Sequence, residues 1–221
     1  MIEKMPFKLG CDLETIVSPV GQPGAGSASG WQLGLPELTD ELVTLREVRI
    51  SDAPSLVAML STDEVRRYMN PPPSDVAGFE RFIARAQAER SAGSHVCFAV
   101  VPKAYDVSIG IFQARQLDAL FTMGEWGAAL GSQFWGTGVF EAGARLMIDF
   151  LFERVGLHRL EARAAVQNGR ANGAARKMGA VPEGVARQGM TCRGRYHDQL
   201  MWSILADDWR QSKVDQWPMV H

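Results

Sequence analysis

The stretch Gln133-Phe-Trp-Gly136-Thr-Gly138-Val-Phe-Glu141 decides the fold, because it joins a predicted strand at 126–130 to a predicted helix that ends near 155. Glycine lets backbone N–H groups turn toward a ligand, since no Cβ intervenes. The first amides of a helix have no partner inside the helix and lie at its positive end. A strand, a glycine-rich turn and a helix N-terminus therefore indicate an anion site suited to a phosphate or pyrophosphate.

Other interpretations of this glycine pair can be compared with the residues around it. A simple tight turn uses glycine in the same way and stays an alternative. A Walker loop requires Gly-Lys-Ser/Thr, whereas Val139 and Phe140 follow Gly138. A dinucleotide fingerprint requires a third glycine, and Glu141 stands in its place. A nucleotide or NAD binder is therefore disfavoured.

The segments around this loop predict a mixed architecture. On its C-terminal side the pattern predicts a strand at 160–166, a helix at 171–178 that Gly179 terminates, and strands at 184–190 and 197–205 with a turn at 193–194. On its N-terminal side it predicts a strand at 43–48, a short helix that carries Leu56, Val57 and Leu60 and is capped by Ser51 or Asp52, and a break at 71–73. A helix with apolar positions from 76 to 86 and Gly93 near its end follows, and then strands at 95–101 and 107–112.

The resulting order is strand, two helices, three strands, helix, strand, helix, two strands. This order is typical of an α+β, or mixed α/β, domain in which helices cover a single sheet. Residues 1–41 differ, because 21–30 are rich in Gly, Ser and Ala, as in a flexible linker. We therefore expect an N-terminal extension at 1–41 and a compact domain at 42–221.

Composition narrows the function classes. The chain has 221 residues and a formal net charge of -2, so no basic excess predicts nucleic-acid binding. Its apolar runs are shorter than the roughly 20 residues of a membrane-spanning helix. The three cysteines, Cys11, Cys97 and Cys192, are widely spaced, and neither they nor the histidines have metal-ligand spacing. We expect no metal and a cytoplasmic protein.

At family level, Gln133-x-x-Gly136-x-Gly138 resembles the Gln/Arg-x-x-Gly-x-Gly/Ala pyrophosphate loop of the GCN5-related N-acetyltransferases (GNAT). The resemblance runs from about 42 to 209 and is closest to the RimJ/RimL branch. Further runs that resemble this branch are 156–163, Asn168, 177–180, 183–184 and 194–198. Their common order makes the resemblance more specific than any one of them.

The resemblance implies a fold and a function. The fold is one largely antiparallel twisted sheet, flanked by helices, whose central strands splay so that the pantetheine arm of acetyl-CoA lies in the gap. The function is transfer of an acetyl group to a primary amine, either a protein N-terminus or a small molecule, by direct attack in a ternary complex. The resemblance also implies a homodimer.

The resemblance implies a set of cofactor-binding residues. The backbone of Ala128, Ala129 and Leu130 holds the arm, and N–H groups of the splayed strand stabilise the oxyanion. Asn168 lies near the pantetheine, and Asn172 is a possible hydrogen-bond donor nearby. The pyrophosphate is held along the loop by Gln133, Phe134, Trp135, Gly136, Thr137, Gly138, Val139 and Phe140.

The catalytic residues are less constrained by the pattern. Glu125 matches a position where the family often has a base, and its alternative is an exposed acid at a strand start. Tyr196 and Asp198 either line the acceptor pocket or order the last hairpin. Ala171 replaces a serine that can protonate the thiolate, and 171–178 contains no tyrosine. A second hypothesis is therefore a non-catalytic acyl-CoA-binding module.

Overall fold

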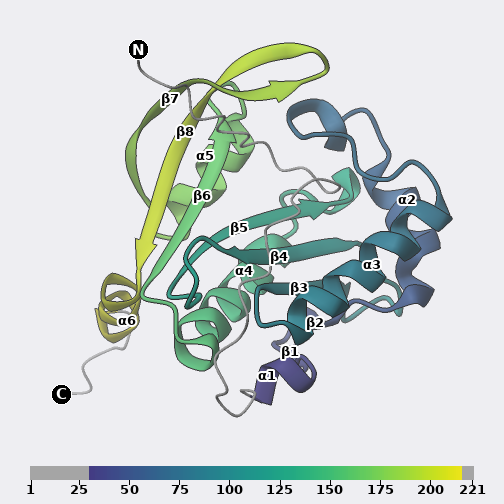
Figure 1. Ribbon diagram of the computed structural model, residues 1–221, viewed down its shortest axis with the longest axis horizontal. Coiled ribbons are helices and arrows are strands. Elements are labelled where there is room, and N and C mark those ends of the chain that lie inside the picture. Colours follow the sequence, from purple (N-terminus) through teal and green to yellow (C-terminus); the bar gives the residue numbers. More distant parts are fainter. Residues whose placement is uncertain (1–29, 216–221) are drawn as a thin grey trace.

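The computed structural model describes residues 30–215 as one mixed sheet with helices on both faces (Figure 1). The strands of the described chain are β1 (Leu38–Thr39), β2 (Val43–Glu47), β3 (His95–Pro102), β4 (Gly110–Gln116), β5 (Met123–Leu130), β6 (Arg159–Ala165), β7 (Val181–Cys192) and β8 (Arg195–Leu205). Its α-helices are α1 (Gly30–Leu33), α2 (Ala53–Leu60), α3 (Val76–Ser91), α4 (Val139–Phe150), α5 (Gly169–Lys177) and α6 (Ala206–Asp215). Short 3₁₀ turns are η1 (Ile50–Asp52), η2 (Val65–Tyr68) and η3 (Ser132–Phe134), and η4 (Leu151–Val155) is a π-helical turn.

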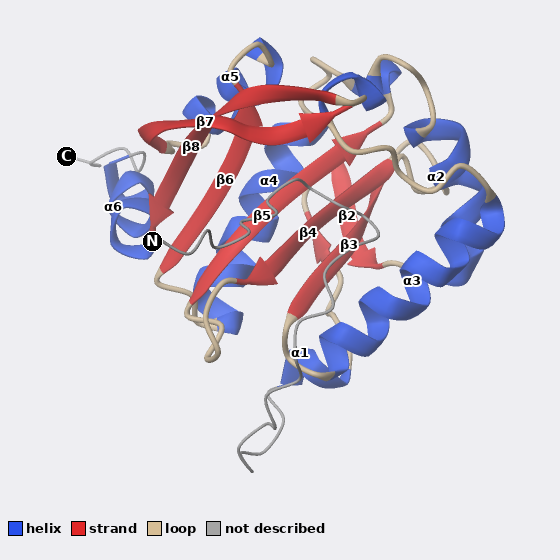
Figure 2. Cartoon of the chain, turned by 45° about the horizontal axis from the view of Figure 1, so that its top comes forward, coloured by secondary structure: helices blue, strands red, loops and turns tan. Residues whose placement is uncertain are grey.

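One strand pair breaks the regularity of the sheet. The strand order is β1-β2-β3-β4-β5-β6-β8-β7, and all neighbours are antiparallel except β5 and β6. These two strands pair only from Met123 opposite Arg159 to Glu125 opposite Glu161. Beyond that point they diverge (Figure 2). The splayed central strands that the family resemblance implies are therefore present.

Alternating side chains on the strands build an apolar core on each face of the sheet. One core packs α4 and α5 against Phe98, Phe112 and Trp126. The other packs α2 and α3 against Ile111 and Ala129. Gly143 lets α4 approach the sheet closely, because a Cβ there would lie 2.7 Å from the Phe112 ring.

The predicted fold class and the predicted order of elements are confirmed. Three strand starts were wrong, each by three residues: those of β4, of β5 and of β7, which begins at Val181 rather than 184. β4 begins at Gly110 rather than 107, and Ser108, just before it, donates its hydroxyl to the Gly110 carbonyl. β5 begins at Met123 rather than 126, because pairing with β4 and β6 extends a segment of weak strand propensity.

Three short elements lie outside the predicted set. Part of the predicted extension is packed on the domain: α1 buries Trp31 edge-on against Phe121, and β1 pairs with β2. α6 follows β8 and buries Trp209, whose indole N–H donates to Asp149. Residues 1–29, which hold most of the predicted linker, lie outside the described residues.

The described part of the chain contains neither a helix that could span a membrane nor a cluster of metal-binding side chains. No helix within residues 30–215 has the length and apolarity that crossing a bilayer demands. The same residues contain no group of His, Cys, Asp or Glu side chains able to hold a metal ion.

Candidate functional site

Two glycines shape the turn between β5 and α4. Gly136 has φ 77° and Gly138 has φ 88°, a left-handed conformation that residues with a Cβ rarely adopt. Gly138 is the N-cap of α4 and brings no capping side chain. Thr137 donates its hydroxyl to the Phe134 carbonyl at 2.7 Å and so stabilises the turn from within. The turn is therefore held open by backbone conformation.

The turn leaves a run of free amides at the start of α4. Within the described residues, the N–H groups from Gly136 to Glu141 donate to no backbone or side-chain oxygen, and the first helical bond is that of Ala142 to Gly138. Burying such donors without partners is costly, so they need water or a ligand. Six consecutive free amides at a helix N-terminus form an anion site. The simple tight turn does not account for them.

Trp135 connects this turn to the rest of the site. Its indole N–H donates to the Leu130 carbonyl at 3.1 Å. The guanidinium carbon of Arg170 lies 3.9 Å from the centre of the Trp135 ring, a cation–π contact. Arg170 stands in the first turn of α5, where the helix dipole disfavours a cation. The contact holds a positive charge beside the anion site.

The gap between β5 and β6 exposes part of the β5 backbone. Gly131 donates to the Ile109 carbonyl, so odd-numbered residues of β5 bond to β4 in the antiparallel ladder. The N–H and C=O groups of Trp126, Ala128 and Leu130 consequently face the gap, although Trp135 occupies the Leu130 carbonyl. The prediction for Ala129 was wrong, because its backbone groups bond to β4. Trp126, which the sequence analysis omitted, takes its place.

The two asparagines of α5 have different environments. Asn168 is the N-cap, and its side-chain oxygen accepts from the Ala171 amide at 3.1 Å. Asn172 is 7% exposed and donates to the Ala165 and Val166 carbonyls, while its oxygen accepts from the Trp202 indole. Its amide group is fully used in holding β6, α5 and β8 together. These contacts use both N–H groups of Asn172, which disfavours its predicted hydrogen bond near the cofactor.

Glu125 lies at the point where β5 and β6 separate. It is 8% exposed, so the alternative of an exposed acid at a strand start is wrong. Its carboxylate lies 3.9 Å from the Arg115 guanidinium. Glu161, opposite it on β6, is held more tightly, with Arg159 at 3.0 Å and Arg163 at 3.4 Å. Of these neighbouring carboxylates, Glu125 is the one with the weaker charge partner.

The last hairpin crosses over to the segment between α2 and α3. The Cys192 thiol donates to the Met69 carbonyl at 3.2 Å, and Arg193 pairs with Asp63 at 2.9 Å. Tyr68 packs against a small buried cluster of β6, β7 and the hairpin tip, formed by Ala165, Met190 and Cys192. Burial raises the pKa of Cys192, which agrees with an inert thiol. No pattern in the sequence predicts this bridge.

The hairpin residues singled out by sequence are separate from Glu125. Asp198 accepts from the Gln188 amide at 2.7 Å, where Gln188 has φ 50°, so it orders a bulge in β7. Tyr196 is 70% exposed. It lies seven residues along β8 from Ser203, the partner of Glu161, which is about 23 Å of strand. Tyr196 therefore lies far along β8 from the row of Glu125, and its catalytic role stays a prediction.

A mixed sheet with one splayed parallel pair, and an anion-binding turn at the end of the splayed strand, defines the class of acyl-CoA-dependent acyltransferases. Comparison with known families agrees: the model of the Acetyltransferase (GNAT) domain matches residues 43–181. The chain belongs to the GNAT acetyltransferase family.

Individual relatives are moderately similar. YdaF of Bacillus subtilis, provisionally described as a ribosomal N-acetyltransferase, is 32% identical over 110 residues, which are 49% of this chain and 60% of YdaF. The uncharacterised N-acetyltransferase p20 of Bacillus licheniformis is 29% identical over 169 residues, 76% of this chain and 95% of p20. Mycobacterium smegmatis RimJ, solved with CoA-disulfide, superposes with a TM-score of 0.69 at 21% identity, over 78% of this chain and 87% of RimJ.

Proposed function

We propose that this chain transfers an acetyl group from acetyl-CoA to a primary amine by direct attack in a ternary complex. The observation that carries the proposal is the run of free amides from Gly136 to Glu141 at the end of a splayed strand. These amides would hold the pyrophosphate of CoA, and Arg170 beside Trp135 would add a positive charge. The CoA ligand named for RimJ supports this choice of anion.

The gap in the sheet suits the pantetheine arm. The arm carries amide groups, and the backbone of Trp126 and Ala128 offers free donors and acceptors along one side. This pairing would extend the sheet where β6 has left it. An arm lying there would present the thioester near Glu125, since the gap begins at that residue.

Glu125 is the proposed base. An amine attacks only when neutral, so Glu125 would take its proton directly or through water. The amine nitrogen then bonds to the thioester carbon, the C–S bond breaks, and the sulfur leaves with the bonding electrons. A gap-facing N–H of β5, such as that of Ala128, would stabilise the oxyanion. A thiol with a pKa near 8.5 leaves without a dedicated acid, so water would protonate it.

Two acceptor classes remain from the sequence, and one has support. The name of YdaF describes a ribosomal N-acetyltransferase, which favours a protein N-terminus over a small amine. A homodimer and a cytoplasmic location stay predictions from the family resemblance. Size-exclusion chromatography with light scattering would measure the first.

The test follows free thiol from acetyl-CoA with a thiol-reactive dye, in the presence of peptides with free N-termini and of small amines. The proposal predicts thiol release that requires an amine and scales with its concentration. N-terminally acetylated peptides of the same sequence are the matched control and should release nothing above background.

The non-catalytic module is the alternative, because Ala171 and the remainder of 171–178 offer no acid for the thiolate. It predicts that CoA binds by calorimetry while no amine accelerates thiol release. That result would favour the binding-module hypothesis over the enzyme hypothesis. The absence of CoA binding would contradict both hypotheses.

A further inference from the structure

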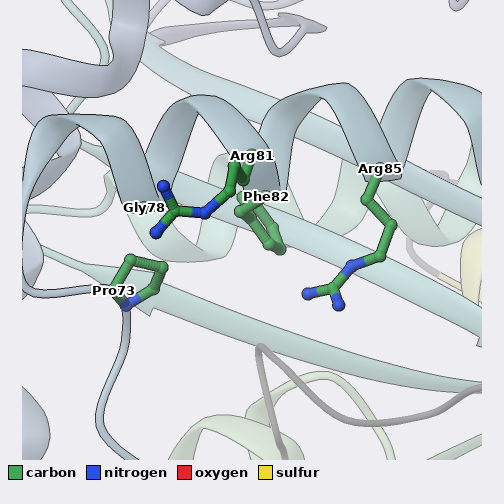
Figure 3. A pocket seen from close by; sticks show the side chains of 5 residues that line it. All are labelled: Pro73, Gly78, Arg81, Phe82 and Arg85. Carbon is green, nitrogen blue, oxygen red and sulfur yellow. The ribbon is translucent and has the colours of Figure 1, made fainter.

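A cavity of about 380 Å³ lies along α3, outside the site described above. It is lined by Pro73, Gly78, Arg81, Phe82 and Arg85. Figure 3 shows the Arg81 guanidinium between α3 and Pro73, with the Arg85 side chain on the other side of the Phe82 ring. Phe82 and Pro73 therefore form an apolar floor, with the Phe82 ring between the two arginine side chains and Pro73 next to the Arg81 guanidinium.

This cavity opens on the same side of the sheet as Glu125. Phe82 belongs to the apolar core that includes Ala129. Ala129 lies four residues after Glu125 on a strand whose register with β4 is regular, so both side chains project from one face. The face that α3 partly covers is therefore the face on which the proposed base lies.

The distance between the cavity and Glu125 can be estimated from the residues that pair with Glu125 across the sheet. Across the sheet, His95 pairs with Arg115 and Arg115 with Glu125. Glu89 of α3 lies over that row, with its carboxylate 3.1 Å from His95. Arg85 and Arg81 are four and eight residues nearer the start of α3, which is about 6 Å and 12 Å of helix. His95 and Glu125 are also two strands apart, about 10 Å, so the cavity lies roughly 11–15 Å from the base. Long side chains at both ends shorten this to a few residues of extended chain.

The cavity carries an excess of positive charge. Arg81 is exposed and, among the residues that the structure describes, has no ion-pair partner. The acid nearest the start of the helix, Asp75, caps α3 by accepting from the Gly78 amide at 2.7 Å. Burial pushes the pKa of Glu89 up, but the hydrogen bond from His95 and nearby arginines outweigh it and leave that pKa lowered. Asp75 is thus committed to the helix cap. Glu89 is bound by His95 and feels the charge of Arg85, so Arg81 is the cation of the cavity on which the argument rests.

Gly78 allows the cavity to have this shape. A Cβ at this position would lie 2.8 Å from the Pro73 Cβ and 3.7 Å from an Arg81 guanidinium nitrogen. Glycine therefore lets the proline segment and the Arg81 side chain approach the helix together. The Arg81 guanidinium thus lies beside Pro73 while the residue stays exposed to solvent.

We propose that this cavity binds an acidic side chain of the acceptor, so that the preferred acceptor is a peptide with Glu or Asp shortly after its N-terminus. The inference rests on the proposed function and names its substrate class. A carboxylate can bond two N–H groups of a guanidinium at once, and its methylene groups fit against Phe82. At roughly 3.3 Å per residue of extended chain, the acid lies about two to four residues after the acceptor amine.

The experiment compares peptides that differ only in having Glu, Gln or Lys at position 2, 3 or 4. In the wild-type protein, Glu at one of these positions raises kcat/KM about 5–10-fold over Gln, and Lys lowers it. In Arg81→Gln the Glu preference falls to about twofold or less, and in Arg81→Glu the Lys peptide becomes the better substrate. Arg154→Gln, an exposed arginine on η4, is the matched control and keeps the wild-type ratio.

Two readouts separate this inference from the function on which it rests. The KM for acetyl-CoA stays within about twofold in both Arg81 variants, since no residue that lines the cavity belongs to the turn between β5 and α4. An Arg81→Gln protein that retains the full Glu preference overturns the cavity assignment while leaving the enzyme intact. If no peptide releases thiol, equilibrium binding of the same peptides still tests the cavity, and equal affinities for Glu and Gln peptides overturn it.

Discussion

Replacing Gly136 by glutamate places a carboxylate in the turn that we propose for the CoA pyrophosphate. Because a Cβ at Gly136 meets no atom within 4 Å, the new side chain fits without collision. The positive φ of 77° adds a conformational cost of about 1–2 kcal/mol for any residue with a Cβ. Gly136→Ala has the same conformational cost but no charge, so it is the matched control.

The electrostatic magnitude follows from the geometry of the turn. A carboxylate about 5 Å from a phosphate, at an effective dielectric constant of about 20, is repelled by roughly 3 kcal/mol per unit charge. Screening by water and salt in this open turn reduces the penalty to about 1.5–3 kcal/mol. The dissociation constant for CoA should therefore rise about 10–100-fold in Gly136→Glu, and less than about threefold in Gly136→Ala.

Calorimetry with CoA measures both affinities, and thermal unfolding checks that both variants are folded. Each variant should lose about 2–8 °C in Tm from the shared backbone cost. Folded Gly136→Glu with wild-type affinity for CoA would refute the assignment of the turn. Equal weakening in both variants would mean that backbone conformation, and not charge, controls binding.

Three further predictions concern other parts of the molecule. Glu125→Gln should lower thiol release most below pH 8, where an α-amine is largely protonated, and an unaltered pH–rate profile removes Glu125 from the mechanism. Arg170→Ala should raise the dissociation constant for CoA about 3–10-fold but leave that for pantetheine, which has no phosphate, unchanged; calorimetry with both ligands decides. Arg159 and Ser203 lower the pKa of Glu183 to about 2, below an unfolded value near 4.3. This stabilisation exists above pH 4.3 and disappears as the pH falls toward 2, so the Tm difference between wild type and Glu183→Gln should vanish there in calorimetric scans, whereas a constant difference contradicts the pairing.

Local pattern was sufficient for most of the fold. Alternation on β2 and β6 and the helical spacing of α3 and α4 reflect burial of one face, which sequence encodes directly. Met123 to Glu125 carry no strand propensity, and only their neighbours in space make them a strand. The packing of Trp31 on Phe121 depends on contacts between distant segments, which local pattern does not reveal.

The candidate site also contains residues that the sequence predicts and residues that only the structure reveals. Gly136 and Gly138 were predictable, because left-handed backbone conformation is a property of the residue itself. That the backbone of Trp126 faces the gap, whereas that of Ala129 bonds to β4, depends on the register between β4 and β5. Local sequence does not reveal this register. The use of Asn172 by Trp202 joins segments far apart in sequence, and no motif precedes it.

A crystal structure of the protein with CoA tests the central claim most directly. The account predicts pyrophosphate oxygens within about 2.7–3.2 Å of backbone nitrogens between Gly136 and Glu141, with the pantetheine arm along the free edge of β5. An empty turn, with CoA bound at another place on the protein, would contradict it.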